Sequence, residues 1–429
     1  MRLLLSFESM KNKKNLGNVI FFLMLISMSF FLASGEISRN AFYILTYIAV
    51  ITFIWLVIKK DKKVYFYLVP TLFLALGLSK WIWAFVTVNH HLPLIAEHYE
   101  ISGKRMILGS FLLYIIHRMS ADWEISPLLV KYGTLLLCVM LIVVTIINVN
   151  IALVTHDRPK INSDAATSGA YMFTLLALVT LWSIRHIFKR HYILPITIIS
   201  AISFILLAVS GTRSAIILFT IFCASGVIYY VAHSNWKMRI SALTLLFLII
   251  FTGIFFAGKY SSELLSRVDS VKTEVTEYQN GNPSTSIGGR IGMWQSGIWA
   301  FAQHPWGQSA DSRNDEAKIW IEKNQPSNKI ALWHIQFHTH NDLVESFSLQ
   351  GIIGGAIMLA LFTSLLFAPF TGSEKRYELL LLAIPVVYFS MGDSQFYNRE
   401  SPYFIMLLWG YFFMMRHAKT TFILNKKSR

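Results

Sequence analysis

The sequence predicts an all-α membrane protein that crosses the bilayer many times. Of its 429 residues, 55% are hydrophobic and only 14% are charged, whereas soluble domains carry roughly a quarter charged residues. Apolar runs of roughly 17–25 residues, the length that a helix needs to cross a bilayer, recur between short polar connectors. The aromatic content of 14% fits Trp and Tyr side chains at the membrane–water interfaces.

The apolar runs define about twelve expected spans. The first run follows three lysines and resembles a signal peptide, but further spans follow it, so we expect it to remain as the first span. The expected spans are residues 17–34, 41–58, 64–84, 104–117, 127–148, 169–184, 192–210, 214–232, 240–258, 346–368, 378–392 and 402–415.

Basic connectors fall on one side of this topology. Lys and Arg gather at the N-terminus, at 59–63, 185–190, 237–239 and 375–376, and in the tail from Arg416. Connectors of this kind face the cytoplasm, so an even number of spans leaves both termini there. The net charge of +15 then reflects loops that face anionic membrane lipids, and we expect no nucleic-acid partner.

Three regions follow from this topology. Residues 1–258 carry the first nine spans, residues 259–345 form one large outward-facing loop, and residues 346–429 carry three spans and a basic tail. Because the loop is the one long polar stretch among many spans, we expect the chemistry there.

The large loop is expected to be mainly helical. Apolar residues at helical spacing predict an interfacial helix over 261–278, and Gly, Ser and Asn predict a flexible connector over 280–289. An apolar helix is expected over 291–301, ended by His304 and Pro305.

Two arginines stand where an anionic group would be bound. Arg213 follows a break between two apolar runs, and Arg290 follows Gly289 at the expected start of a helix. Glycine lets a ligand approach the backbone, a helix N-terminus attracts anions, and guanidinium matches phosphate oxygens in pairs. Two outward arginines would suit a diphosphate; the alternative for Arg213 is an interfacial side chain that reaches lipid headgroups.

Histidines gather at the end of the loop. His334, His338 and His340 lie close to Asp342 and Glu345. An extended strand would place His338 and His340 on one face, where neutral imidazoles are common zinc ligands. Because no second ligand cluster follows at zinc spacing, we favour a metal-free site in which one histidine is a general base and one of the other two is structural.

Three more charged residues are expected on the same side of the membrane. Arg158 lies in the outward loop 149–168, and Asp393 and Arg399 lie in the loop before the last span. Solvated loop charges are the alternative to a shared outward cavity.

The motif around His340 resembles that of the O-antigen ligase and polymerase family. His340 and Asn341 are followed, after nine residues, by Gly351, two further residues and Gly354. Arg213 after a span break and the Gly289–Arg290 pair match the family's outward arginines. Two further patterns resemble those of O-antigen ligases. They are the spacing of Asp393 and Arg399, and the pair Asp157–Arg158 followed by residues 166–171.

The resemblance implies an O-antigen ligase in the inner membrane of a Gram-negative bacterium, with its active site facing the periplasm. Such an enzyme is an inverting, metal-independent glycosyltransferase of the GT-C type that needs no cofactor. It transfers O-polysaccharide from undecaprenyl diphosphate to a sugar hydroxyl of lipid A–core.

The resemblance also implies roles for individual residues. Arg213 and Arg290 would bind the diphosphate, and His340 would take the acceptor proton. The residues expected to bind substrate are His338, Asn341, Arg158, Asp393, Arg399 and Gly289.

Two other functions compete with this interpretation. An O-antigen polymerase would use the same donor with a second lipid-linked glycan as acceptor. A transporter or flippase is typically built from repeated halves with charges at the membrane midplane. Here the charges gather at one membrane face and no repeat is visible, which favours the ligase over a transporter or flippase.

Overall fold

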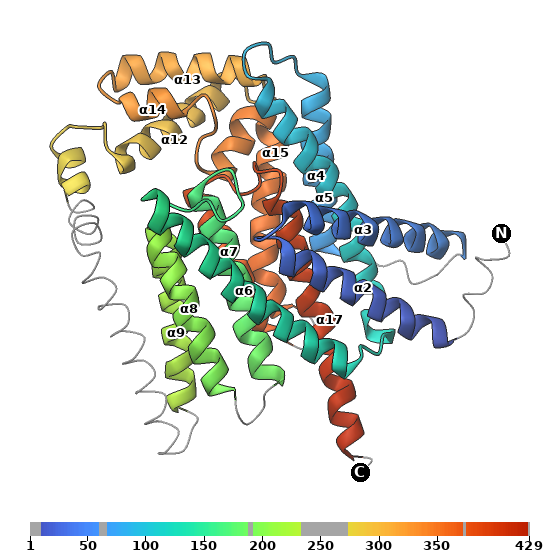
Figure 1. The fold of residues 1–429 in the computed structure, drawn as a ribbon. Coiled ribbons are helices and arrows are strands. Elements are labelled where there is room, and N and C mark those ends of the chain that lie inside the picture. Colours follow the sequence, from blue (N-terminus) through green and yellow to red (C-terminus); the bar gives the residue numbers. More distant parts are fainter. Residues whose placement is uncertain (1–9, 60–66, 188–191, 233–272, 372–374, 428–429) are drawn as a thin grey trace.

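The computed structural model describes residues 10–59, 67–187, 192–232, 273–371 and 375–427, and no strand occurs among them. Figure 1 shows a helical bundle with a cluster of short helices, α12 to α14, at one end. The all-α prediction is therefore confirmed for the described part of the chain. The expected span 240–258 and most of the expected interfacial helix 261–278 lie outside it, although residues 273–279 are helical.

The bundle begins with eight helices in chain order: α2 (Met10–Phe30), α3 (Gly35–Ile58), α4 (Leu68–Val86), α5 (Pro93–Met119), α6 (Pro127–Thr155), α7 (Ala166–Ile187), α8 (Ile193–Ser210) and α9 (Arg213–Ala232). After them come α12 (Ser286–Gln303), α13 (Ala310–Asn324), α14 (Lys329–His334), α15 (Asp342–Phe367), α16 (Leu380–Gly392) and α17 (Ser401–Lys427).

Six of these helices are long and apolar enough to cross a membrane: 35–58, 68–86, 127–155, 166–185, 193–210 and 342–370. Shorter apolar helices cover 15–30, 213–229 and 377–392. Each expected span inside the described residues coincides with a helix, but the count of about twelve membrane spans is not confirmed. The expected span 104–117 lies inside α5, which is longer and carries charges such as Glu100 and Lys104.

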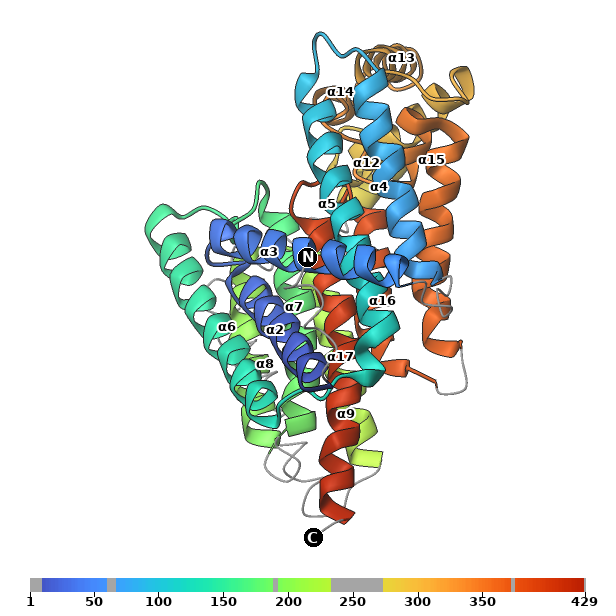
Figure 2. The same cartoon turned by 90° about the vertical axis from the view of Figure 1, so that its right-hand side faces the viewer.

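Helix α17 is the centre of the hydrophobic core. Nearly every residue from Ser401 to Met415 is buried, because helices from both halves of the chain surround it (Figures 1 and 2). Phe404 stacks on Phe31 of the α2–α3 turn at 3.9 Å between ring centroids, and the Tyr411 hydroxyl lies 3.0 Å from that of Ser183 on α7. The short last expected span, 402–415, thus lies at the centre of the bundle.

The helices between residues 286 and 334 begin at side-chain caps. Thr285 accepts a hydrogen bond from the Gly288 N–H at 3.0 Å, and Ser309 caps α13 in the same way, as expected of N-cap residues. Helix α12 therefore begins at Ser286, inside the stretch expected to be a flexible connector. Its end at Gln303, just before Pro305, confirms the predicted stop.

A kink in α15 joins the loop to the bundle. Gly351 has φ +67°, and a Cβ there would lie 2.5 Å from the Pro305 carbonyl oxygen and from the Gly307 nitrogen. The Ile352 N–H donates to that Pro305 carbonyl at 2.8 Å. The first glycine of the motif is thus needed for a left-handed backbone and a close chain crossing.

Candidate active site

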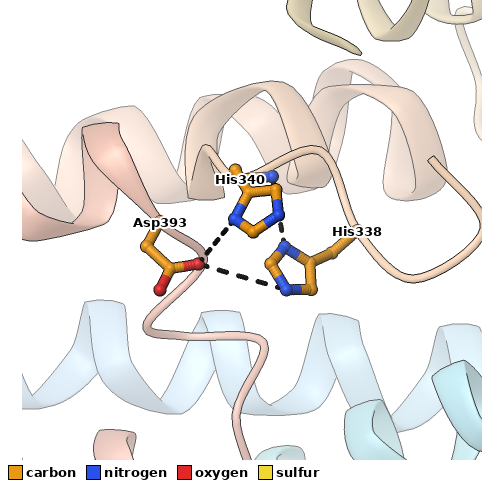
Figure 3. Close-up of side chains that lie close together, drawn as sticks. All are labelled: His338, His340 and Asp393. Atoms are coloured by element: carbon orange, nitrogen blue, oxygen red, sulfur yellow. Dashed lines mark hydrogen bonds and ion pairs between the residues drawn. The ribbon is translucent and has the colours of Figure 1, made fainter. Parts of the chain in front are cut away.

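His340 and Asp393 meet where the turn before α15 contacts the loop after α16. The Nδ1 atom of His340 lies 3.0 Å from Asp393 Oδ1, although one residue precedes α15 and the other follows α16 (Figure 3). A carboxylate only accepts hydrogen bonds, so Nδ1 of His340 carries the proton. The Nε2 atom of a neutral His340 ring is then the proton acceptor, as a general base requires.

Asp393 is held as a carboxylate. Burial alone would raise the pKa of its carboxyl group, but the hydrogen bond and charge of His340, the charge of His338 and the Ser394 N–H together keep that pKa well below its usual range. Its second oxygen accepts from the Thr167 hydroxyl at 3.1 Å. Asp393 is therefore an ionised, fixed partner for the His340 ring at any physiological pH.

His338 is the second histidine of the group. The His340 N–H donates to His338 Nδ1 at 3.1 Å, and the two ring centroids are 4.2 Å apart. Burial, followed by the charge of His340, lowers the pKa of His338 to about 3. Tyr397 lies against the other side of the ring at 5.1 Å between centroids. His338 is thus neutral and held in place, in keeping with a supporting role.

The turn before α15 has an unusual backbone. His340 has φ 54°, a conformation that non-glycine residues seldom adopt; residues 335–337 form a turn, His340 lies at a bend, and no strand is assigned over 338–341. The expectation of an extended strand is therefore wrong, although the two imidazoles still meet. Asn341 stabilises the turn, because its side chain caps α15 through the Leu343 and Val344 N–H groups at 3.0 and 3.2 Å.

A buried ion pair stabilises this turn. Arg313 of α13 contacts Glu345 of α15 at 2.9 Å, with side-chain exposures of 0% and 1%. The same Glu345 oxygen accepts the Thr339 N–H at 2.8 Å. The pair therefore connects α13 to the turn that carries His338 and His340.

A second buried set of charges holds the loop that carries Asp393. The Lys80 ammonium donates to the Phe396 carbonyl at 2.9 Å, and the Asp342 carboxylate accepts the Phe396 N–H at 2.9 Å. Lys80 also lies over the Tyr99 ring, 3.9 Å from its centroid. Sequence reasoning missed Lys80; its signal was one lysine inside an otherwise apolar run, which is costly unless it is paired.

Arg213 is the first residue of α9. Its guanidinium lies 3.8 Å from the Glu274 carboxylate, with 39% of its side chain exposed. The neighbouring Ser214 hydroxyl is 2.8 Å from that of Tyr171. Arg158 holds the preceding turn, because it donates to the Ser210 carbonyl at 2.6 Å and to the Thr212 hydroxyl at 3.0 Å. The structure therefore gives Arg158 a supporting position behind Arg213.

Arg290 lies in the first two turns of α12, rather than at its first residue. Its charge lowers the pKa of His334, after burial and the charge of His340, and the His334 and His340 ring centroids are 5.8 Å apart. Gly289 packs against α14, since a Cβ there would lie 2.5 Å from Ile330 Cγ2. The small residue thus lets two helices approach, which places Arg290 near the histidines.

Arg399 lies at the other end of the Asp393 loop. It pairs with Glu97 of α5 at 3.0 Å, and its side chain is 36% exposed. Its backbone carbonyl accepts from Arg105 at 2.7 Å. Among the residues predicted for the site, His338, His340 and Asp393 touch one another, whereas Arg399 faces a different part of the surface.

The three touching residues also have the donor atoms of a metal site. One ligand atom each from His338, His340 and Asp393 lies within 4.8 Å of the others. Two imidazoles and a carboxylate are a common zinc ligand set. The direct His340–Asp393 hydrogen bond accounts for the same arrangement without an ion, so the metal-free expectation stays a prediction.

Comparison with known proteins gives two matches. A family model described as O-antigen ligase matches residues 198–359, a stretch that contains Arg213, Arg290 and His340 and ends before Asp393. An O-antigen ligase of Escherichia coli (strain K12) is 26% identical over 344 residues, which are 79% of this chain and 79% of that protein. Over these residues, which include the motif at His340, the chain is similar to O-antigen ligases.

Proposed function

We propose that the chain is an inverting glycosyltransferase that moves O-polysaccharide from undecaprenyl diphosphate to a sugar hydroxyl of lipid A–core. The observation that carries the proposal is the His340–Asp393 pair, 3.0 Å apart, at the histidine of the family motif. A transfer to an alcohol needs a base beside the acceptor, and this pair supplies one. We further propose that the site faces the periplasm of a Gram-negative bacterium and that both termini are cytoplasmic, since the basic connectors face the cytoplasm.

In this mechanism Nε2 of His340 removes the proton of the acceptor hydroxyl as its oxygen attacks the anomeric carbon of the donor sugar. The bond from that carbon to the diphosphate oxygen breaks on the opposite face, so the configuration inverts. Asp393 stabilises the resulting imidazolium through the proton on Nδ1. An ionised carboxylate in that place fixes both the tautomer and the orientation of the ring.

The leaving diphosphate carries the negative charge that develops in the reaction. Arg213 and Arg290 would bind it, because guanidinium stays charged and matches phosphate oxygens in pairs. Arg213 has 39% of its side chain exposed and a carboxylate at 3.8 Å, a weak exposed pair that a diphosphate would replace. Arg290 has no ion pair with any described residue.

The test is a reconstituted transfer. Purified protein is mixed with lipid-linked O-polysaccharide and lipid A–core in the presence of a chelator, and polymer-bearing lipopolysaccharide is scored. We expect the product with wild type and none with His340→Ala. A longer lipid-linked polymer without transfer to core would identify a polymerase. Product that appears only when zinc replaces the chelator would assign a metal to His338, His340 and Asp393.

A further inference from the structure

A cavity lies beside residues 398–401, at the end of the loop that follows Asp393. It has a volume of about 470 Å³ and is lined by three arginines, Arg39, Arg105 and Arg399, together with Asp164 and Glu400. Cavities of roughly 300–1,000 Å³ suit ligands the size of a small molecule or headgroup. Apolar side chains complete the lining: Phe31, Leu32, Ile101 and Met172.

Acidic side chains form ion pairs with the arginines of the cavity and fix their positions. One oxygen of Glu400 contacts Arg39 at 3.3 Å and Arg105 at 3.0 Å. Arg105 is only 7% exposed, whereas Arg39 is 41% exposed. Arg105 also donates to the Tyr43 hydroxyl and to the Arg399 carbonyl. The buried arginine thus organises the wall, and the exposed one presents N–H donors to the cavity.

The exposed ion pairs here are weak enough to be exchanged. The Arg39–Glu400 and Arg399–Glu97 pairs both leave more than a third of the arginine side chain exposed, and such exposed pairs add little to stability. A phosphoryl group offers each guanidinium two oxygens and a higher charge than a shared carboxylate. A phosphate in the cavity would therefore gain contacts without disrupting the fold.

Helix α7 separates this cavity from the site described above. Thr167 contacts Asp393, and Tyr171 contacts Ser214 beside Arg213. The adjacent face of the same helix, with Ser168 and Met172, lines the cavity, because consecutive helical residues are 100° apart. The cavity and the residues beside Asp393 and Arg213 therefore share helix α7.

We propose that this cavity binds the phosphoryl group of an anionic lipid headgroup, and that in the proposed ligase reaction this lipid is the phosphorylated glycolipid acceptor. The inference rests on the proposed function for the identity of the acceptor. The mixed lining suits an amphiphilic headgroup, with arginines for the phosphate and apolar side chains for the adjoining groups. Bulk anionic phospholipid has the same phosphoryl chemistry and is the other source.

The test measures binding without turnover. Detergent-purified protein is titrated with lipid A–core, with the same glycolipid after enzymatic removal of its phosphates, and with phosphatidylglycerol. Arg39→Gln should weaken binding of the phosphorylated glycolipid on the order of 10-fold, the effect of losing a charge-assisted hydrogen bond, and should leave binding of the dephosphorylated one unchanged. Higher salt should reduce the difference.

The control is Lys104→Gln, which removes one positive charge from the same helix as Arg105. Lys104 pairs with Glu100 on the surface and does not line the cavity, so binding should not change. Arg39→Lys keeps the charge but not the paired N–H donors, so it should bind the phosphorylated glycolipid more weakly than wild type and more tightly than Arg39→Gln, which would show that the fold tolerates a change at this position. The titration measures binding and not turnover, so a failure of the proposed reaction leaves this readout intact.

Two outcomes separate the sources. Preference for the phosphorylated glycolipid over phosphatidylglycerol supports the acceptor, whereas equal, Arg39-dependent binding of both lipids supports a general phospholipid site and overturns the acceptor assignment. Equal affinity of wild type and Arg39→Gln for every lipid overturns the proposal.

Discussion

The imidazole Nδ1 of His340 lies 3.0 Å from the carboxylate of Asp393, 53 positions later in the chain. This contact joins the turn before α15 to the loop before α17. It fixes the proton on Nδ1 and leaves Nε2 for the substrate. Asp393, expected from the sequence to bind substrate, contacts the His340 ring, and in the proposed mechanism it orients the base.

Removal of the Arg290 charge should abolish transfer while the protein still inserts and folds. Arg290→Ala is expected to lower kcat about 10²–10³-fold, as the loss of a group that stabilises developing charge does.

Arg213→Lys should lower kcat/KM for the donor about 10-fold, because one ammonium does not replace a two-pronged contact. Initial rates of polymer-bearing lipopolysaccharide formation measure both. Normal rates in Arg290→Ala would remove Arg290 from the mechanism.

Arg158 should act through the turn that it supports. Arg158→Ala loses hydrogen bonds to the Ser210 carbonyl and the Thr212 hydroxyl, each with a net value of about 0.5–1.5 kcal/mol. We expect KM for the donor to rise roughly 3–10-fold, with kcat little changed and partial recovery in Arg158→Lys. Lys160→Ala, in the same loop, is the control and should behave as wild type. An unchanged donor KM would leave Arg158 with no part in placing Arg213.

The buried charges beneath the site should be coupled. Lys80→Met leaves the buried Asp342 without the positive charge that interacts with it, and removal of one of two interacting buried charges costs about 3–5 kcal/mol. Thermal unfolding should show a large fall in Tm for Lys80→Met and for Asp342→Asn. The double variant should lose less than the sum of the two. Additive losses would mean that the two charges act independently.

Acid should destabilise the histidine turn. The pKa of His338 falls from its ordinary 6.5 to about 3 on folding, so the unfolded chain takes up the proton first. The stability that depends on neutral His338 is present above pH 6.5 and is lost as the pH falls toward 3. The loss approaches about 1.4 kcal/mol per pH unit.

The measurement is Tm between pH 7.5 and 4.5 for wild type and His338→Phe. The variant should show a shallower fall than wild type, because it has no imidazole to protonate. The pKa of the Asp393 carboxyl, which folding lowers, adds its own loss only at more acidic pH. Parallel curves for the two proteins would contradict a neutral, buried His338.

The apolar runs of the sequence predicted where helices occur, because a chain in a bilayer must satisfy its backbone within each segment. They did not predict how the helices pack. The short run 402–415 becomes the buried centre of the bundle, and residues of the charged N-terminal half of α5 line the cavity that contains Arg39 and Arg105. Those outcomes depend on contacts between distant segments, which periodicity does not contain.

The sequence predicted individual residues of the site but not the contacts between them. The histidine motif and the outward charges pointed to His340, Arg290 and Asp393. The contact of Lys80 with Phe396 joins residues 316 positions apart, and no local pattern announces it. Asn341 could have been recognised as an N-cap, since Asn before an apolar helical run is a start signal.

The most direct test of the account is a double-mutant cycle on the dyad. Single-turnover rates of transfer are measured for wild type, His340→Ala, Asp393→Asn and the double variant. If Asp393 acts only through His340, each single change lowers the rate by about 10²–10⁴-fold, and the double variant is no slower than His340→Ala. Losses that multiply in the double variant, or near-normal transfer by Asp393→Asn, would contradict the assignment of the pair as one catalytic unit.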